Sequence, residues 1–312
     1  MRDKDVLESA GMTILIIRPG ALGDTLMLAP ALAEMRGRED MILVARRPAL
    51  DILRPLVREG MDYEGGGWHR LFMDDLYVME GLQQIDLTVA FLSDRSGKSR
   101  DHLQAFMPGS SVHVFPPFPQ ETERVHAAFH LARCLESSGC AVNPARALAE
   151  AAGRPLLGID TIPLCDSKRG VVFHPGSGGP LKNHPGEFCE ALLRELRDAL
   201  SNKVPLVILL GPAEESSLSF YRERLPGDGV EIIFSPETEP LLRLLKSARL
   251  YLGHDSGVTH LAAMMGTPTV ALFRNSSLDL WKPLGPRVTV IQGEGGPGLI
   301  GQICRTARDL AL

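Results

Sequence analysis

Short, continuous apolar runs alternate with amphipathic stretches along the chain, and this alternation constrains the fold more than any other feature. The first half contains "TILIIR", "MILVAR", "DLTVAFL" and "SSVHVFP", and the second contains "GVVFHPG", "VPLVILLG", "VEIIF", "ARLYLGH" and "TVALF". The intervening stretches place apolar residues at helical spacing, for example from about Thr25 to Met35. Such runs are typical of parallel strands covered by helices on both faces. The pattern predicts an α/β protein with doubly wound parallel sheets.

The length of the chain favours two such sheets. It has 312 residues, more than a single hydrophobic core usually organises. The alternation is interrupted in residues 145–170, which include "GRPLLGIDTIPLCDSKRG". We therefore expect two domains, over residues 1–160 and 161–312, and we allow for the final helix to pack back on the first domain. Ligands of such domains bind outside the carboxyl ends of strands or in a cleft between domains.

Composition excludes several classes of protein. Charged residues make up 23% and apolar residues 44% of the chain, as in ordinary globular proteins, and the formal charge of −5 argues against a general nucleic-acid binder. The five cysteines form no C-x-x-C pair, which fits a reducing compartment rather than a zinc site or a disulfide scaffold. The start, "MRDKDVLESAGM", has no apolar core of a signal peptide, and no run reaches the roughly 18 apolar residues of a membrane span. We expect a cytoplasmic protein.

The segment "RPGALGD", residues 18–24, directly follows the first apolar run. Its glycines, Gly20 and Gly23, do not form the dinucleotide fingerprint G-x-G-x-x-G. The segment is therefore either an ordinary tight turn or a device that brings Arg18 and Asp24 to the mouth of a cleft. In the second case Asp24 is placed to act as a base.

The loop "HPGSGGPLKNHP", residues 174–185, lies between a predicted strand and a predicted helix. The glycine-rich part around Ser177 and Gly178 lets the backbone approach a ligand and present N–H groups to an anion. Lys182 adds a mobile positive charge near the helix start, where negative groups are favoured. The loop is not a Walker A motif, and it is equally compatible with a flexible connection that carries a solvated lysine.

The segment "GHDSGVTHLAAMMG" begins a second helix directly after a predicted strand. Helix capping alone explains Asp255 and Ser256 ahead of Gly257. A helix N-terminus at the end of a parallel strand is also a ready phosphate site. His260, in the first turn, is either a ligand contact or a packed histidine.

Two acidic residues follow a third predicted strand, in "LLGPAEESS". Glu214 or Glu215 could accept hydrogen bonds from ribose hydroxyls, or could be a first-turn acid that the helix dipole favours. Together, the three loops of the second half would supply backbone N–H groups, a lysine and carboxylates, which are the groups expected at a nucleoside-diphosphate site. The first half contributes Asp24, which suggests a donor domain that faces an acceptor domain.

The ordered combination of "RPGALGD", "HPGSGGPLKNHP", "GPAE" and "HDSGVTHLAAMMGTPTVALF" resembles the bacterial heptosyltransferases of glycosyltransferase family 9, which build the inner core of lipopolysaccharide. The resemblance runs from about Ile14 to about Gly285. It implies the GT-B fold, in which two Rossmann-like domains face each other across a cleft. It further implies an inverting, metal-independent transfer without a cofactor, in which an ADP-linked heptose is the donor substrate.

The resemblance also implies roles for particular residues. Asp24 would be the general base that deprotonates the acceptor hydroxyl, and Lys182 would hold the donor diphosphate. Glu214 or its neighbour Glu215 would contact the nucleoside. The remaining residues expected to bind substrate or donor are Arg18, Gly23, Ser177, Gly178, Asp255, Ser256, Gly257 and His260.

The implied acceptor is a lipid-linked glycan, so we expect at most peripheral contact with the cytoplasmic face of the inner membrane. Two residues depart from the family pattern: His184 replaces a usual aromatic residue, and Arg274 follows "TVALF" where a glycine is usual. They leave open a non-catalytic protein that binds sugar nucleotides. A GT-B nucleotide-sugar epimerase is a further alternative, because "HDSG" at a helix start suits those enzymes too, although "RPGALGD" weighs against it.

Overall fold

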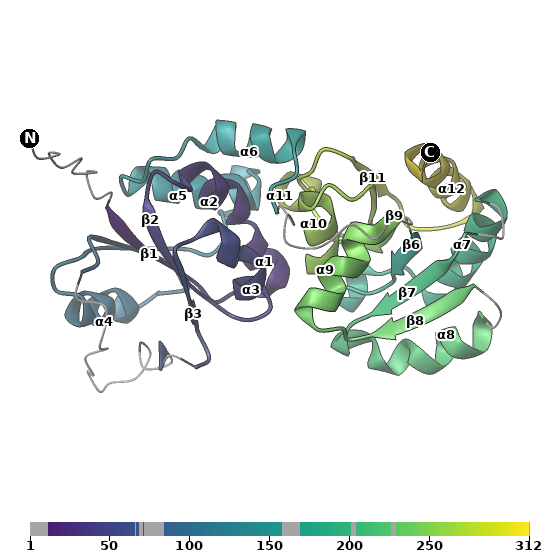
Figure 1. The fold of residues 1–312 in the computed structure, drawn as a ribbon, viewed down its shortest axis with the longest axis horizontal. Helices are drawn as coiled ribbons and strands as arrows, with labels where there is room; N and C mark the ends of the chain where they lie inside the picture. The colour runs from purple at the N-terminus through teal and green to yellow at the C-terminus, as the bar shows by residue number, and fades with distance from the viewer. Residues whose placement is uncertain are drawn as a thin grey trace, which may run out of the picture.

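Two parallel sheets form the framework of the protein (Figure 1). The computed structural model describes residues 12–65, 67–68, 71, 84–157, 169–200, 204–225 and 229–311. The first sheet has the strand order β3-β2-β1-β4-β5 and the second β11-β10-β9-β6-β7-β8, with every neighbouring pair parallel. The strands are β1 (Thr13–Arg18), β2 (Asp40–Ala45), β3 (Glu59–Asp62), β4 (Leu87–Phe91), β5 (Ser111–Phe115), β6 (Arg169–His174), β7 (Leu206–Leu210), β8 (Val230–Phe234), β9 (Ala248–His254), β10 (Thr269–Phe273) and β11 (Val288–Gln292). The predicted doubly wound α/β architecture is confirmed.

Helices cover both faces of the first sheet, and the side chains of β1 explain why. Ile14 and Ile16 pack in one apolar cluster with α2 and α5, whereas Leu15 and Ile17 point to the opposite face and pack with α4. Successive side chains of a strand point to opposite faces, so a strand covered on both sides is apolar throughout. The first-domain helices are α1 (Leu22–Leu26), α2 (Ala29–Met35), α3 (Ala49–Leu53), α4 (Lys98–Phe106), α5 (Ala127–Ser137) and α6 (Pro144–Gly153), with short 3-10 helices η1 (Arg54–Leu56) and η3 (Glu121–Glu123).

The helix expected from Thr25 to Met35 is divided into α1 and α2. Pro30 stands in the first turn of α2. Proline has no N–H to donate to the preceding turn, and its ring clashes with the carbonyl four residues earlier. A helix therefore ends ahead of Pro30 and a new one begins there, which leaves α1 as a short separate element at the end of β1.

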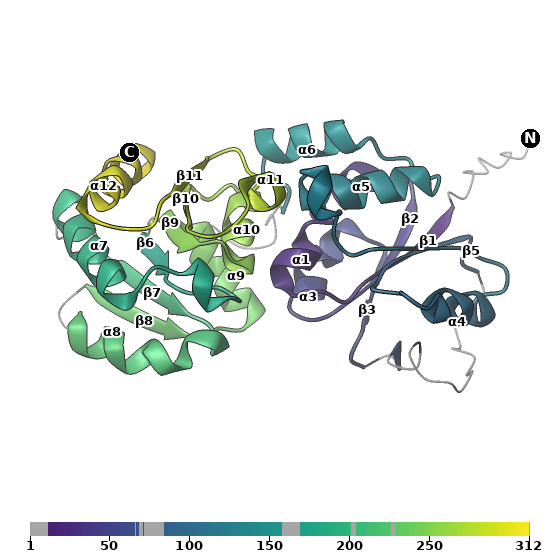
Figure 2. The same ribbon diagram turned by 180° about the vertical axis from the view of Figure 1, so that it is seen from behind.

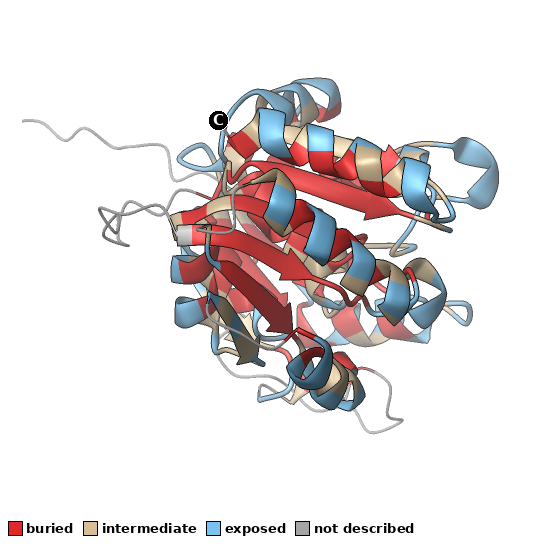
Figure 3. Ribbon diagram, turned by 90° about the vertical axis from the view of Figure 1, so that its right-hand side faces the viewer, coloured by how far each residue is buried: buried red, intermediate tan, exposed pale blue. Residues whose placement is uncertain are grey.

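The second sheet is covered in the same way, and its central strands are buried between helices whose outer faces are exposed (Figure 3). The helices are α7 (Gly186–Ala199), α8 (Leu218–Arg224), α9 (Thr238–Ser247), α10 (Gly257–Met264), α11 (Leu278–Trp281) and α12 (Pro297–Ala311), with 3-10 helices η4 (Pro180–Lys182) and η5 (Pro212–Ser217). The final helix, α12, packs against α7 and on β9 and β10 of the second sheet. Ile300, Ile303 and Ala307 bury its apolar face there. These contacts of α12 all lie within the second domain.

The two halves of the chain are joined by apolar contact. Figure 2 shows α10 and α11 of the second half beside α1 and α6 of the first. One continuous cluster contains Leu32 of α2, Leu245 of α9 and Leu261 of α10. The backbone N–H groups of Leu156 and Leu157, beyond α6, both donate to the carbonyl of Met264. The expected domain break near residue 160 falls in residues 158–168, outside the described residues, so its exact position stays a prediction.

Candidate active site

Two glycines bring the first and second domains into direct backbone contact. A Cβ atom on Gly257 would lie 2.8 Å from the backbone nitrogen of Gly23, and one on Gly23 would lie 3.2 Å from the Cα of Gly257. Only residues without a side chain allow two backbones to approach this closely. The contact packs the start of α1, from "RPGALGD", against the start of α10, from "HDSGVTH". The structure thereby brings together the two motifs that the sequence analysis assigned to opposite sides of a cleft.

Arg18 and Asp24 form the first-domain side of this contact. Arg18 ends β1 and is only 3% exposed. Burial lowers the pKa of its guanidinium to about 10, against the opposing effect of the Asp24 carboxylate nearby, so Arg18 stays charged at neutral pH. Its Nε has no hydrogen-bond partner among the described residues. Asp24 lies half-buried in the first turn of α1, and its carboxylate and the Arg18 guanidinium attract each other.

Lys182, Asp255 and His260 form the second-domain side. The Nζ of Lys182 donates to Oδ2 of Asp255 at 2.8 Å, and Nε2 of His260 lies 3.5 Å from Oδ1 of the same carboxylate. Burial alone would raise the pKa of Asp255, which is 3% exposed, but its contacts with His260 and Lys182 more than offset this and lower the pKa to about 2. The side chain of Lys182 is 38% exposed. A positive charge is thus held beside the N-terminus of α10 while remaining open to solvent.

Ser256 caps α10 and is connected to Glu214 through His174. Its hydroxyl accepts from the backbone N–H of Thr259 at 3.3 Å and lies 3.2 Å from Nδ1 of His174. Nε2 of His174 lies 3.6 Å from Oε2 of Glu214. Burial would raise the pKa of Glu214, but the hydrogen bond to His174 helps to lower it. The result is a buried Glu214–His174–Ser256 chain that ends at the helix cap.

The two glutamates of "GPAEES" therefore differ. Glu214 is 8% exposed, and it accepts a hydrogen bond from the backbone N–H of Gly211 at 2.8 Å besides its contact with His174. A Cβ on Gly176 would lie 2.0 Å from the Glu214 carboxylate, so the glycine makes room for it. Glu215 is exposed. The carboxylate of Glu214 is bound within the protein, a fact that the spacing of the motif did not reveal.

The glycine-rich loop after β6 is braced by its own serine. The hydroxyl of Ser177 donates to the carbonyl of Gly179 at 2.9 Å, and Ser177 itself is 6% exposed. Gly178 is exposed, with open space where a side chain would be. The backbone at Gly178 is accordingly accessible to a ligand.

The two residues that depart from the family pattern serve the structure of this loop. Arg274 donates to the carbonyl of Asn183 at 3.1 Å and pairs with Glu294 at 3.1 Å. His184 is 5% exposed, and its ring stacks on Phe188 with centroids 4.4 Å apart. These contacts account for both residues by packing and hydrogen bonding. Neither lines the cavity described next.

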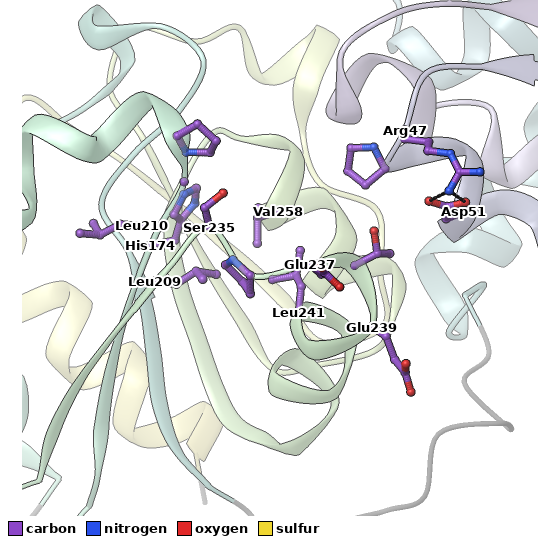
Figure 4. A pocket seen from close by; sticks show the side chains of 15 residues that line it. Arg47, Asp51, His174, Leu209, Leu210, Ser235, Glu237, Glu239, Leu241 and Val258 are labelled. Atoms are coloured by element: carbon purple, nitrogen blue, oxygen red, sulfur yellow. Dashed lines mark hydrogen bonds and ion pairs between the residues drawn. The ribbon is translucent and has the colours of Figure 1, made fainter. Parts of the chain in front are cut away.

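A cavity of about 640 Å³ lies between the domains, within the usual size range of small-molecule sites (Figure 4). On the first-domain side it is lined by Arg47, Pro48 and Asp51. On the second-domain side it is lined by His174 and Val258 together with Leu209–Pro212, Ser235–Glu239 and Leu241. The cavity lies at the ends of β7 and β8 and beside the first turn of α10, which contributes Val258. His174 connects its wall to the Ser256 cap.

Sequence reasoning missed the first-domain wall of this cavity. Arg47 follows β2 directly, and it is held by Asp51 at 3.3 Å and by Asp62 at 3.1 Å. The signal was present, because "ARRP" stands at the carboxyl end of a predicted parallel strand, where ligands of such sheets bind. Within the described ranges, no group of three or more His, Cys, Asp or Glu side chains is placed to hold a metal ion. In the same part of the chain, no helix is long and apolar enough to cross a bilayer.

Comparisons with known proteins agree with this architecture. The fold matches the glycosyl transferase family 9 protein of Veillonella parvula DSM 2008, with a TM-score of 0.72 and 16% identity over 96% of this chain and 97% of that one. It also matches the E. coli ADP-heptose lps heptosyltransferase II, with a TM-score of 0.69 and 19% identity over 96% and 98% of the two chains. At these identities the likeness establishes a shared fold.

Two matches in sequence identify the family. The lipopolysaccharide heptosyltransferase 1 of Campylobacter coli is 27% identical over 119 residues, which span 35% of this chain and only 33% of that protein. Residues 97–298, more than half of the chain, match the sequence model of the family described as glycosyltransferase family 9 (heptosyltransferase). The chain therefore belongs to glycosyltransferase family 9, the heptosyltransferase family.

Proposed function

We propose that this chain is an inverting, metal-independent glycosyltransferase that moves heptose from ADP-heptose to an acceptor of the lipopolysaccharide-core type. The observation that supports the proposal is the backbone contact between Gly23 and Gly257. It packs α1, the helix that carries Asp24, against the start of α10, next to Asp255 and its partner Lys182. The proposed donor and acceptor are those named by the E. coli and Campylobacter coli relatives.

The donor would bind to the second domain. Lys182 and the N-terminus of α10 at Ser256 and Gly257 would hold the diphosphate, together with backbone N–H groups near Ser177 and Gly178. Negative charge grows on the diphosphate as its bond to the anomeric carbon breaks, and a lysine with oriented N–H groups stabilises that charge. The nucleoside would lie in the 640 Å³ cavity. Neither Glu214 nor Glu215 lines that cavity. Because Glu214 is already bonded within the protein, the exposed Glu215 would be the freer of the two to meet a ribose hydroxyl at its rim.

The acceptor would approach Asp24 from the first domain. Its hydroxyl oxygen forms a bond to the anomeric carbon, the bond from that carbon to the diphosphate breaks, and the hydroxyl proton passes to the Asp24 carboxylate. A positioned general base contributes roughly 10²–10⁴-fold to such a step. A single displacement inverts the anomeric configuration. Arg18 would attract the Asp24 carboxylate and help to position it, and His260 would orient the Asp255 carboxylate that holds Lys182.

The acceptor would be a lipid-linked glycan, reached by peripheral contact at the cytoplasmic face of the inner membrane. This part of the proposal rests on the lipopolysaccharide acceptors that the relatives' names imply.

Calorimetric titration with ADP, UDP, GDP and CDP, in a chelator, tests the proposal first. We expect saturable binding of ADP and weaker binding of the others, followed by transfer from ADP-heptose to a lipopolysaccharide-core acceptor. Preference for another nucleotide would retain the site but replace the donor. Binding without turnover would favour the non-catalytic alternative, and isomerised sugar formed without an acceptor would favour an epimerase. Absence of binding to all four nucleotides would refute the proposal.

A further inference from the structure

The proline-rich segment "FPPFPQ", residues 115–120, has no role in the function proposed above. It follows β5 and carries Phe118 between Pro117 and Pro119. Each proline has a fixed φ, and a residue that precedes proline is itself restricted to extended backbone. The side chain of Phe118 is nevertheless 36% exposed, which is unusual for so large an apolar ring. The segment therefore holds an exposed aromatic ring at the edge of the first domain with little backbone freedom.

Phe118 lies between Arg18, beside the proposed base, and Trp281, which contacts the proposed diphosphate-binding Lys182. The guanidinium carbon of Arg18 is 4.9 Å from the centroid of its ring. The ring of Trp281, on α11 of the second domain, meets Phe118 edge-on with centroids 5.6 Å apart. The Nζ of Lys182 lies 5.8 Å from the centroid of the Trp281 ring. Four side chains thus form a row from the proposed base to the proposed diphosphate site, in which two aromatic rings lie between two cations: Arg18, Phe118, Trp281 and Lys182.

A hydrogen bond next to Trp281 fixes this arrangement between the domains. Nε2 of His126 lies 2.8 Å from the carbonyl of Lys282, and Nδ1 of the same ring accepts from the backbone N–H of Ala128 at 3.2 Å. Both contacts are made at once only by a neutral ring with its proton on Nε2. Burial lowers the pKa of His126 to about 4, which keeps the ring neutral at pH 7. Both ribbon views place α11 at the junction of the domains (Figures 1 and 2).

We propose that Phe118 and Trp281 form an interdomain aromatic gate that keeps water from the reaction centre, so that the acceptor hydroxyl rather than water attacks the donor. This inference rests on the proposed transfer reaction. Water competes for the same step: its oxygen would bond to the anomeric carbon, the bond to the diphosphate would break, and a proton would pass to Asp24. Exclusion of water suppresses that hydrolysis and strengthens electrostatic interactions within the site. Arg18, which lies against the Phe118 ring, is only 3% exposed, so this ring helps to shield the base side of the site from solvent.

The ratio of donor hydrolysis to transfer tests the gate. Phe118→Ala and Trp281→Ala, each assayed with ADP-heptose in the presence and absence of a lipopolysaccharide-core acceptor, should raise this ratio severalfold. Phe118→Tyr keeps the aromatic ring, so its ratio of donor hydrolysis to transfer should stay close to that of the wild type. Phe234→Ala is the matched control, because it removes a 40% exposed ring from β8, at the opposite edge of the second sheet from β11. It should leave the ratio as in the wild type.

Acrylamide quenching of tryptophan fluorescence provides a measurement that needs no donor. The chain has two tryptophans, and Trp68 is 1% exposed, so the quenchable signal belongs to Trp281. Phe118→Ala should increase quenching, and Trp281→Phe should abolish the quenchable fraction. An unchanged hydrolysis ratio in an active Phe118→Ala variant would overturn the gate while leaving the proposed function intact. A wild type that neither transfers nor hydrolyses would instead contradict the proposed function, and unchanged quenching in Phe118→Ala would then still refute the gate.

Discussion

Lys182 is the residue whose surroundings bear most directly on donor binding. Its ammonium donates to a carboxylate whose pKa is held near 2, and it lies over the ring of Trp281. An anion that approaches the N-terminus of α10 would find this charge already in place. Sequence spacing predicted Lys182 and Asp255 as site residues but could not predict that they are bonded to each other, since 73 residues separate them.

Lys182→Ala should weaken binding of a nucleoside diphosphate by about ten- to a hundredfold, because a hydrogen bond to a charged group is worth roughly 1.5–3 kcal/mol. Calorimetric titration with ADP measures the change. Lys246→Ala, in the last turn of α9, is the matched control and should leave the affinity unaltered. Equal affinity in wild type and Lys182→Ala would mean that the diphosphate binds elsewhere.

His254 makes the protein sensitive to mild acid. The ring is completely buried at the end of β9, and burial together with the neighbouring His184 lowers its pKa to about 3. An unfolded histidine titrates near 6.5, so below that pH the unfolded chain takes up a proton that the folded chain does not. The free energy of unfolding should therefore fall as the pH decreases from about 6.5 towards about 3.

Urea unfolding between about pH 7 and about pH 5 measures this dependence. His254→Asn should reduce this pH dependence without abolishing it, because burial also lowers the pKa of His126, to about 4. His113→Asn, at a half-buried position on β5, should reproduce the wild-type slope. A wild type whose stability is constant or rises over this interval would contradict the account.

At the scale of elements, apolar runs located the central strands but not all of the edges. The buried strands β1, β4, β7 and β9 coincide with runs that the sequence analysis identified. The edge strand β3, "EGMD", has no apolar run, and β11, "VTVIQ", is only partly buried. Edge strands are packed on fewer sides and so leave a weaker hydrophobic pattern in the sequence.

The division between α1 and α2 was missed for a different reason. The helical spacing of apolar residues continues across Pro30, although the helical hydrogen bonding does not.

The contact between α1 and α10 yields a prediction at this scale. Gly257→Ala would place a methyl group 2.8 Å from the backbone of Gly23 and from the side chain of Leu22. Overpacking of this kind typically costs about 1–3 kcal/mol, and separation of the two helices should also lower the rate of transfer. Gly298→Ala, where no atom lies within 4 Å of the added group, is the control. The expectation fails if the two variants unfold at the same urea concentration and transfer sugar at the same rate.

For the whole molecule, the order of motifs along the chain predicted an acceptor domain followed by a donor domain. The structure brings motifs of the two domains together at Gly23 and Gly257. The contacts that cross between the domains were not predictable from spacing. Phe118 and Trp281 are far apart in sequence and carry no motif. The position of Arg47 after a predicted strand marked it as a possible ligand contact, but not which second-domain residues it would face across the cavity. Such features depend on how the two sheets are oriented, which local patterns do not encode.

In the proposed reaction, Asp24 of the first domain deprotonates an acceptor hydroxyl beside a donor held by the second domain. Asp24→Asn preserves the shape of the side chain and removes the base, so transfer from ADP-heptose should be abolished while the calorimetric affinity for ADP stays within a few-fold of the wild type. Asp101→Asn, which likewise alters a first-turn acid of a first-domain helix, should retain both properties. Transfer by Asp24→Asn at the wild-type rate, or an equal loss of transfer and ADP binding, would contradict the assignment of Asp24 as the base.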